Sequence, residues 1–491
     1  MPRPNRIPVA RGPSRYPPSP ITPANFPRPS TSSQHPCPAG TTAPHPRPTT
    51  GGMDAHLARR ARRIPSPTDA GNWRLGSQFR AVWEHPTHSG REQGCSQGAR
   101  VESAVGAAVL ARVDAYEWSL EEALRVKPDG LFLGVERWTR DKPVGGHTLV
   151  CTHPNGTQKE HWHPTLRRIL ASDAPARAFG TAEPLPAGPV LIDDIWLIDH
   201  YNHGVSVDLN DGHMGCADIW DDVGRDVLNF IVHVLPSAKQ SAPKDLPWQL
   251  LWRPEGLAPA VKVMGMGGSY GGTGHVMAAH SRPDVYHGVF LADTLIQPRA
   301  LNRSAVLPTE EQDVGTNLAR AAMKRRDAWP SRVEAGRTWR KNPFYATWHP
   351  EVFELTLSHG LVRANPYGVE EGDPNVDDAP VVLATPTWAE ASVFVEPMSS
   401  GRAWDMLPNL KVPVAFLVAE NRFPVDLNRE VVWRAPLARN EKLVGIGHMC
   451  LQENPQAVSE AAVRFLQTLA AGKWGSKDEI RAEYDALAAK L

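Results

Sequence analysis

The chain has 491 residues, and its 53 basic and 53 acidic side chains give a formal net charge of zero. A balanced charge argues against a protein that binds nucleic acid or an anionic membrane through its overall field, so we expect no nucleic-acid partner. No apolar run approaches the roughly 18 residues of a membrane span, and the first residues lack the apolar stretch of a secretory signal. The cysteines are few and far apart, which predicts a reducing compartment and no metal site.

The first part of the chain is rich in proline and arginine and almost free of acidic residues. Asp54 is the only acid before Asp69. Such a segment cannot bury enough apolar surface to offset the entropy of ordering it. We therefore predict a disordered tail over residues 1–100, with residues 70–125 left ambiguous. An arginine-rich, acid-poor composition is also that of an organelle transit peptide, which stays open beside a plain tail.

From about residue 128, short apolar runs alternate with helical stretches. The runs are 130–135, 148–151, 190–198, 261–264, 288–292 and 412–418. Runs of this length suit strands buried on both faces, and their alternation with helices predicts an α/β fold with a mostly parallel, doubly wound sheet. We assign 128–300 to the first part of this core. Residues 301–400 interrupt the alternation and are the predicted cap or lid insertion. Residues 401–491 complete the core and add a C-terminal helix.

The pattern Gly267-Gly-Ser269-Tyr-Gly271 follows a predicted strand and precedes a predicted helix. A serine on such a tight turn exposes its hydroxyl above the sheet, while small neighbours let the backbones pass closely. The helix that follows directs its first amides at developing negative charge. The glycines do not fit the spacing of a dinucleotide-binding loop, and no Gly-Lys-Ser/Thr follows as a P-loop requires. We predict that Ser269 is a nucleophile.

A nucleophilic serine needs a base, and the base needs an acid that orients it. His448 follows a strand that ends in glycines, late in the chain, and is the predicted base. Two carboxylates compete for the third position. Asp293 directly follows the strand 288–292, and Glu420 ends the strand 412–418. We favour Asp293 and keep Glu420 as the alternative.

A polar loop that contains Asn155 and Gly156 follows the strand 148–151. Its backbone amides, together with that of Tyr270 after the nucleophile, form the predicted oxyanion hole. One such donor contributes on the order of 3 kcal/mol to lowering the barrier. A second turn, Asp199–Ser206, is expected to frame the pocket rather than to react.

The predicted cap carries basic and aromatic residues close together, among them Arg325, Arg326 and Trp329. One interpretation is a solvated helix face. The other is a substrate-binding site for an anionic head group, such as that of a CoA thioester, because guanidinium groups pair well with phosphate.

These motifs together resemble the α/β-hydrolase superfamily, whose members carry the oxyanion loop, an Asp-x-x-x-His-Gly-x-Ser turn, the elbow, a cap and a final histidine in this order. The resemblance covers about residues 128–470 and implies an α/β-hydrolase fold with a helical cap. It extends to a fungal branch that includes a peroxisomal lipase and hydrolases of host-selective toxin biosynthesis. The stretches that carry this branch resemblance are His153–Glu160, Ile195–Gly204, Asp218–Trp220, Arg225-Asp226 and Leu383–Glu390. Pro154, Gly268 and Arg422 depart from the residues usual in the superfamily.

A serine nucleophile favours acyl transfer. We expect a serine hydrolase, of lipase, esterase or acyl-thioesterase type, that acts on a small-molecule ester or thioester without a cofactor. Two rival hypotheses remain. One is a lyase or isomerase of secondary metabolism that uses the same triad, and the other is a scaffold that has lost its chemistry.

The chain ends in Ala489-Lys490-Leu491, which resembles the Ser-Lys-Leu address of peroxisomal proteins. A polar helix predicted over residues 476–489 would present this tail to an import receptor. We therefore expect the protein in the peroxisome, with the cytoplasm as the alternative.

Overall fold

A computed structural model describes the part of the chain that forms the core and the cap. The described residues are 73–82, 131–140, 142–172, 177–186, 188–210, 214, 218–236, 249–251, 263–298, 314–364, 379–396, 398–421 and 428–488.

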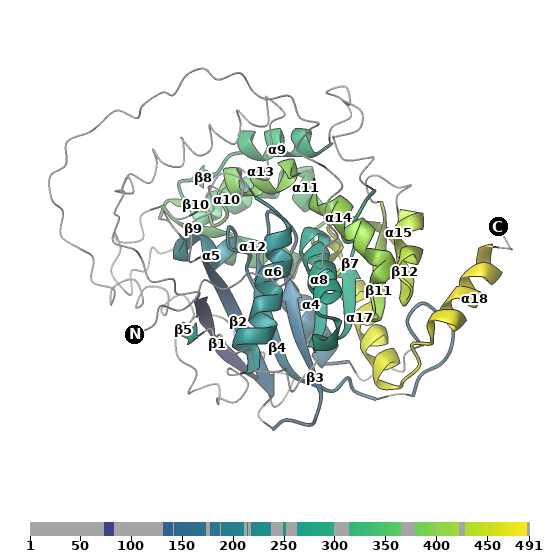
Figure 1. Ribbon diagram of the computed structural model, residues 1–491. Helices are drawn as coiled ribbons and strands as arrows, with labels where there is room; N and C mark the ends of the chain where they lie inside the picture. Colours follow the sequence, from purple (N-terminus) through teal and green to yellow (C-terminus); the bar gives the residue numbers. More distant parts are fainter. Residues whose placement is uncertain are drawn as a thin grey trace, which may run out of the picture. The chain divides into compact units, whose positions relative to one another are not determined.

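One large sheet forms the centre of the fold (Figure 1), and its order is β12-β11-β7-β6-β3-β4-β2-β1-β5. Its strands are β1 (Trp73–Val82), β2 (Phe132–Arg140), β3 (His147–Thr152), β4 (Ile192–Ile198), β5 (Gln249–Leu251), β6 (Val263–Gly268), β7 (Tyr286–Ala292), β11 (Val414–Asn421) and β12 (Ala438–Gly447). All pairings from β4 through β3, β6, β7 and β11 to β12 are parallel. Strand β2 runs antiparallel to β1 and β4. The prediction of a mostly parallel, doubly wound sheet is confirmed.

Strand β1 lies within the range that we assigned to the tail or left ambiguous. It pairs antiparallel with β2 over most of its length. The remaining residues of the predicted tail lie outside the described part of the chain.

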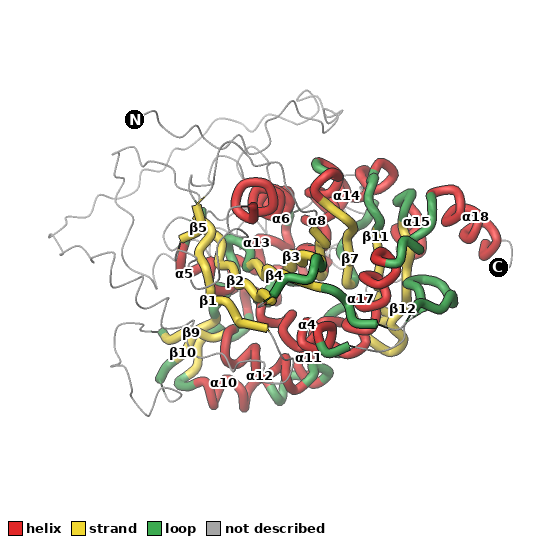
Figure 2. Tube along the Cα trace, turned by 90° about the horizontal axis from the view of Figure 1, so that it is seen from below, coloured by secondary structure: helices red, strands yellow, loops and turns green. Residues whose placement is uncertain are grey.

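Helices cover both faces of the sheet. The helices of the core are α4 (His163–Leu170), α5 (Gly204–Leu209), α6 (Asp221–Asn229), α8 (Ser269–Ser281), α14 (Ser399–Met406), α15 (Asn428–Arg434), α16 (Cys450–Glu453), α17 (Pro455–Ala470) and α18 (Lys477–Ala488). Helices α6 and α8 pack together on one face, and α4 packs with α17 on the other (Figure 2). This layering explains why the central strands are apolar on both faces.

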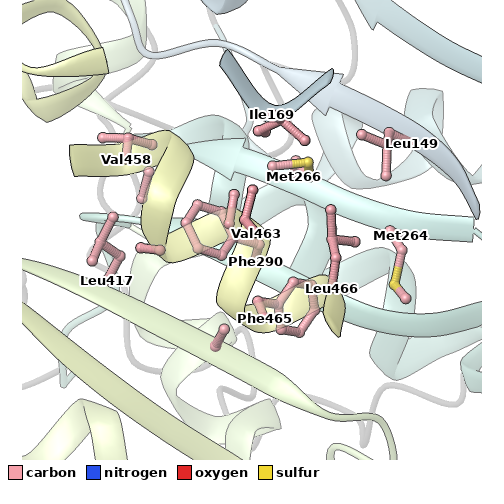
Figure 3. Packing of buried hydrophobic residues seen from close by; sticks show 14 of the residues in the cluster. Leu149, Ile169, Met264, Met266, Phe290, Leu417, Val458, Val463, Phe465 and Leu466 are labelled. Carbon is pink, nitrogen blue, oxygen red and sulfur yellow. The ribbon is translucent and has the colours of Figure 1, made fainter. Parts of the chain in front are cut away.

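The core under α17 shows how the sheet and the helix hold each other (Figure 3). Met266, Phe290 and Leu417 point from β6, β7 and β11 toward Phe465 and other apolar side chains of α17. The rings of Phe290 and Phe465 lie 5.8 Å apart between centroids, and both are fully buried. This packing fixes the strands at whose carboxyl ends the candidate site lies.

The elements from α9 to α13, between β7 and α14, lie in the range of the predicted cap. Its described elements are α9 (Val314–Lys324), β8 (Ala328–Trp329), α10 (Arg332–Trp339), α11 (Pro343–Ala346), α12 (Pro350–His359), β9 (Leu361–Arg363), β10 (Val381–Leu383) and α13 (Thr387–Val395). The three short strands pair antiparallel in the order β8-β10-β9. Beneath them lies an apolar cluster that includes Trp329, Trp339 and Phe353, so the cap has a small core of its own.

Helix α18 precedes the chain end and is tied to β12, because the Arg439 guanidinium pairs with Glu483 at 2.7 Å. The predicted targeting residues Ala489, Lys490 and Leu491 lie outside the described residues. Within the described part, no helix combines the length and the apolar composition that a membrane crossing requires.

Candidate active site

The sharp turn between β6 and α8 places Ser269 at the first position of the helix. Its backbone φ is +51°, in the left-handed region that costs a side-chain-bearing residue energy. The turn also needs small neighbours. A Cβ atom on Gly267 would lie 2.5 Å from the Cα of Gly272, and one on Gly271 would lie 2.6 Å from the carbonyl oxygen of His153. The strained backbone and the close approach are those of a nucleophile elbow.

Ser269, His448 and Asp293 form a chain of short contacts. The Ser269 Oγ lies 3.1 Å from His448 Nε2, and His448 Nδ1 lies 2.6 Å from Asp293 Oδ2. A carboxylate only accepts, so the proton of the neutral imidazole belongs on Nδ1, where it donates to Asp293. Nε2 then accepts from the Ser269 hydroxyl, which is the arrangement a general base requires.

Asp293 is held rigidly in this position. Its φ is +46°, and among the described residues it shares a positive φ outside glycine with Ser269 alone. The Ala419 amide donates to Oδ1 at 2.9 Å, and the carboxylate is fully buried. Asp293 therefore has one oxygen for the backbone of β11 and one for His448.

Glu420, the alternative acid, lies elsewhere. Its carboxylate accepts from Lys442 Nζ at 2.7 Å and from the Gly445 amide at 2.9 Å. The hydrogen bond from Lys442 is the main cause that lowers the pKa of this exposed carboxyl. The structure thus brings Asp293, and not Glu420, to His448.

The loop after β3 is held from two sides. On the core side, the Gly156 amide donates to Nε2 of His203 at 3.0 Å. On the cap side, the Asn155 side-chain amide donates to the carbonyl oxygen of Glu390 at 3.0 Å. Gly156 has a φ of +69°, and a Cβ there would lie 2.7 Å from the Glu390 carboxyl carbon. Of the predicted oxyanion donors, the Gly156 amide is therefore committed to His203. The backbone amide of Asn155 has no hydrogen-bond partner among the described residues. Tyr270 lies in the first turn of α8, where the backbone amides lack acceptors within the helix.

A buried ion cluster supports the loop from behind. Lys159 donates to Asp199 and to Glu160 at 2.7 Å each, and Asp199 also accepts from the Lys159 and Val205 amides. Burial alone would lower the pKa of Lys159, but the attraction of Asp199 and Glu160 outweighs it and raises this pKa. The ion pair between Lys159 and Asp199 thus connects the predicted framing turn to the segment that follows the predicted oxyanion loop. Sequence reasoning flagged the turn through Asp199 and missed Lys159 as its partner.

A pocket lies between this loop and the cap. Its lining residues are Asn155, Gly156, Thr157, Gln158, Arg325, Trp339, Phe344, Tyr345, Trp348, Thr356, Gly360, Leu383, Thr385, Glu390 and Met449. Ser269, His448 and Asp293 are not among these lining residues, and Met449, which directly follows His448 in the chain, is the lining residue nearest to them in sequence.

The three predicted substrate-binding residues of the cap separate in the structure. Arg325 lines the pocket and pairs with Glu390. Burial raises the pKa of Glu390, and the neighbouring Arg325 opposes this shift. Arg326 instead lies over the ring of Trp329 at 5.5 Å, and Trp329 is buried in the cap core. Sequence reasoning missed the pairing of Arg325 with Glu390, because no local pattern joins two residues so far apart in the chain.

Comparisons with known proteins bear on the fold. No protein-family model matches the chain. In sequence, the chain is 25% identical over 242 residues to the peroxisomal membrane protein LPX1 of Saccharomyces cerevisiae. These matched residues cover 48% of this chain and 54% of that protein. The match spans about half the length of this curated relative.

Many solved structures are similar to the chain. One is the peroxisomal alpha-beta-hydrolase Lpx1 from Saccharomyces cerevisiae, with a TM-score of 0.53 and 16% identity over 81% of this chain and 90% of that one. Another is a thermophilic esterase from Thermogutta terrifontis, with a TM-score of 0.42 and 14% identity over 70% of this chain and 95% of that one. The strand order and the structural likeness to Lpx1 together show that the chain has the α/β-hydrolase fold.

Proposed function

We propose that the chain is a serine hydrolase of carboxylic esters or thioesters, with Ser269 as nucleophile, His448 as base and Asp293 as the acid of the triad. The observation that carries this proposal is the chain of contacts from Ser269 Oγ through the His448 ring to the Asp293 carboxylate. The strained elbow under Ser269 supports it, because such strain is retained where it serves function.

The reaction follows from the proton positions. Nε2 of His448 takes the hydroxyl proton as Ser269 attacks the substrate carbonyl, and Asp293 stabilises the imidazolium that forms. The imidazolium then gives its proton to the leaving alcohol or thiol. A water activated by His448 attacks the acyl-enzyme and releases the acid, which restores the serine.

The oxyanion in this proposal is bound by the backbone amides of Tyr270 and Asn155. The Gly156 amide is left out, because its hydrogen is directed at His203. Gly156 instead fixes the loop, and we assign His203 and Glu390 the same supporting role from the core and from the cap. The pocket beside this loop is the proposed site of the acyl group.

We further propose that the protein acts in the peroxisome. The supporting observations are the terminal Ala489-Lys490-Leu491 and the names of the matched yeast protein and structure, both of which are called peroxisomal. The proposed partner is the import receptor that reads such tails. A fluorescent protein fused to residues 476–491 should enter peroxisomes, and the same fusion carrying both Lys490→Ala and Leu491→Ala should stay in the cytosol. Diffuse fluorescence from both fusions would refute the proposal.

The hydrolase proposal is tested with a panel of p-nitrophenyl esters and acyl thioesters in water enriched in oxygen-18. The purified protein should release the acid with one heavy oxygen, and Ser269→Ala should not. A product formed by elimination or rearrangement, without heavy oxygen, would favour the lyase or isomerase alternative. No turnover of any member, by an enzyme whose serine is also unreactive, would favour the inert scaffold.

A further inference from the structure

Most polar side chains that line the pocket have partners within the protein. The Asn155 side-chain amide donates to the Glu390 carbonyl oxygen at 3.0 Å. The Thr157 and Thr356 hydroxyls each donate at 2.8 Å to a backbone carbonyl oxygen. Arg325 and Glu390 pair with each other, so their charges largely cancel.

Besides Arg325, whose Nε has no hydrogen-bond partner among the described residues, two uncharged side chains on the pocket wall differ from this pattern. Gln158 is 4% exposed, and its Nε2 has no hydrogen-bond partner among the described residues. Trp348 is 8% exposed, and its indole N–H likewise has none. Both residues line the pocket, from the oxyanion-loop side and from the cap side respectively. A buried donor without an acceptor is unfavourable, and native proteins rarely retain one without a reason.

The rest of the wall is aromatic. The rings of Trp339 and Tyr345 stack with centroids 5.2 Å apart, and Trp348 meets Tyr345 edge-on at 4.9 Å. Phe344 adds a further ring beside Trp348. The pocket wall is therefore largely aromatic, carries two uncharged N–H donors that have no partner among the described residues, and holds the charge of Arg325 beside that of Glu390.

We infer that the pocket binds an oxygenated acyl group, one whose apolar part contacts these rings and whose oxo or hydroxyl oxygen accepts hydrogen bonds from Gln158 and Trp348. An uncharged oxygen fits better than a carboxylate, because Glu390 already compensates Arg325. This inference rests on the proposed function and names its substrate class. A site that holds buried donors discriminates strongly against analogues that lack the acceptor, since such analogues leave the donors unpaired.

The test compares p-nitrophenyl octanoate with the p-nitrophenyl esters of its oxo-octanoate isomers. The wild type should prefer at least one isomer by about tenfold or more in kcat/KM. Trp348→Phe removes the N–H and keeps a ring, and Gln158→Met removes the amide and keeps the length. Each variant should remove most of that preference, because it lowers kcat/KM for the preferred oxo isomer more than for octanoate.

Trp388→Phe is the matched control. Trp388 is 7% exposed, its indole N–H also has no partner among the described residues, and it does not line the pocket. This variant should keep the wild-type preference. Equal rates on octanoate and every oxo isomer, or a preference that survives both pocket variants, would overturn the inference while the hydrolase proposal stands. Loss of all ester hydrolysis together with an unreactive Ser269 would refute both.

Discussion

Replacing Asp293 by asparagine is the sharpest single perturbation of the proposed triad. Oδ1 of Asp293 accepts from the Ala419 amide at 2.9 Å, and Oδ2 accepts from His448 Nδ1 at 2.6 Å. An asparagine offers one oxygen and one NH₂ group. The oxygen must remain on Ala419, because the opposite orientation would place two donors against each other. The NH₂ group then faces Nδ1, which must become an acceptor.

This change moves the imidazole proton to Nε2. His448 would then donate to Ser269 instead of accepting from it, and the base would be lost without any change of shape. The loss of the correct tautomer in a serine triad lowers kcat by about 10⁴-fold. That factor corresponds to about 5 kcal/mol of barrier.

The assay is steady-state hydrolysis of a p-nitrophenyl ester, with the melting temperature measured in parallel. Glu420→Gln is the matched control, because it makes the same change of carboxylate to amide at the other strand end. We expect Asp293→Asn to lose about 10⁴-fold in kcat and Glu420→Gln to retain most of its activity. The reasoning is refuted if Asp293→Asn stays within tenfold of the wild type or if Glu420→Gln is the variant that collapses.

Three further predictions concern the loop, the elbow and the core. His203→Ala removes the acceptor of the Gly156 amide and should lower kcat by about tenfold with little change in KM, and His203→Gln should restore part of it; equal kcat in all three proteins would contradict this role. Gly271→Ala forces a Cβ toward the His153 carbonyl oxygen, so Ser269 should become unreactive, and a fully active variant would show that the turn can relax. Phe465→Ala should lower the free energy of unfolding in urea by about 3–5 kcal/mol, and a loss below about 1 kcal/mol would contradict the described packing.

The fold could be predicted from the sequence because its signals are local. Apolar runs of strand length alternate with helices, and the glycines around Ser269 appear together in one short pattern. The order of these elements leaves few topologies for a parallel sheet. Strand β1 was not predicted, because it follows a proline-rich segment and is separated from its partner β2 by about 50 residues.

The sequence favoured Asp293 but left Glu420 open as the alternative acid. Asp293 follows β7, and Glu420 lies near the end of its parallel neighbour β11, so from the strand order either could reach a histidine at the end of β12. The structure separates them through contacts that no local pattern records. The backbone of Asp293 has a left-handed conformation, and its carboxylate contacts His448. The carboxylate of Glu420 instead accepts a hydrogen bond from Lys442.

The same limit applies to the oxyanion loop and the cap. The loop was predicted from its position after β3, but the commitment of the Gly156 amide depends on His203, which belongs to another turn. The basic residues of the cap suggested an anionic ligand, because the sequence does not show that Glu390 lies opposite Arg325.

The most direct measurement of the central claim is labelling of the purified protein with a fluorophosphonate probe, with the modified residue located by mass spectrometry. An activated serine should carry the probe on Ser269, and labelling should be lost in both Ser269→Ala and His448→Ala. Absence of labelling in the wild type, a probe on another residue, or undiminished labelling of His448→Ala would contradict the account.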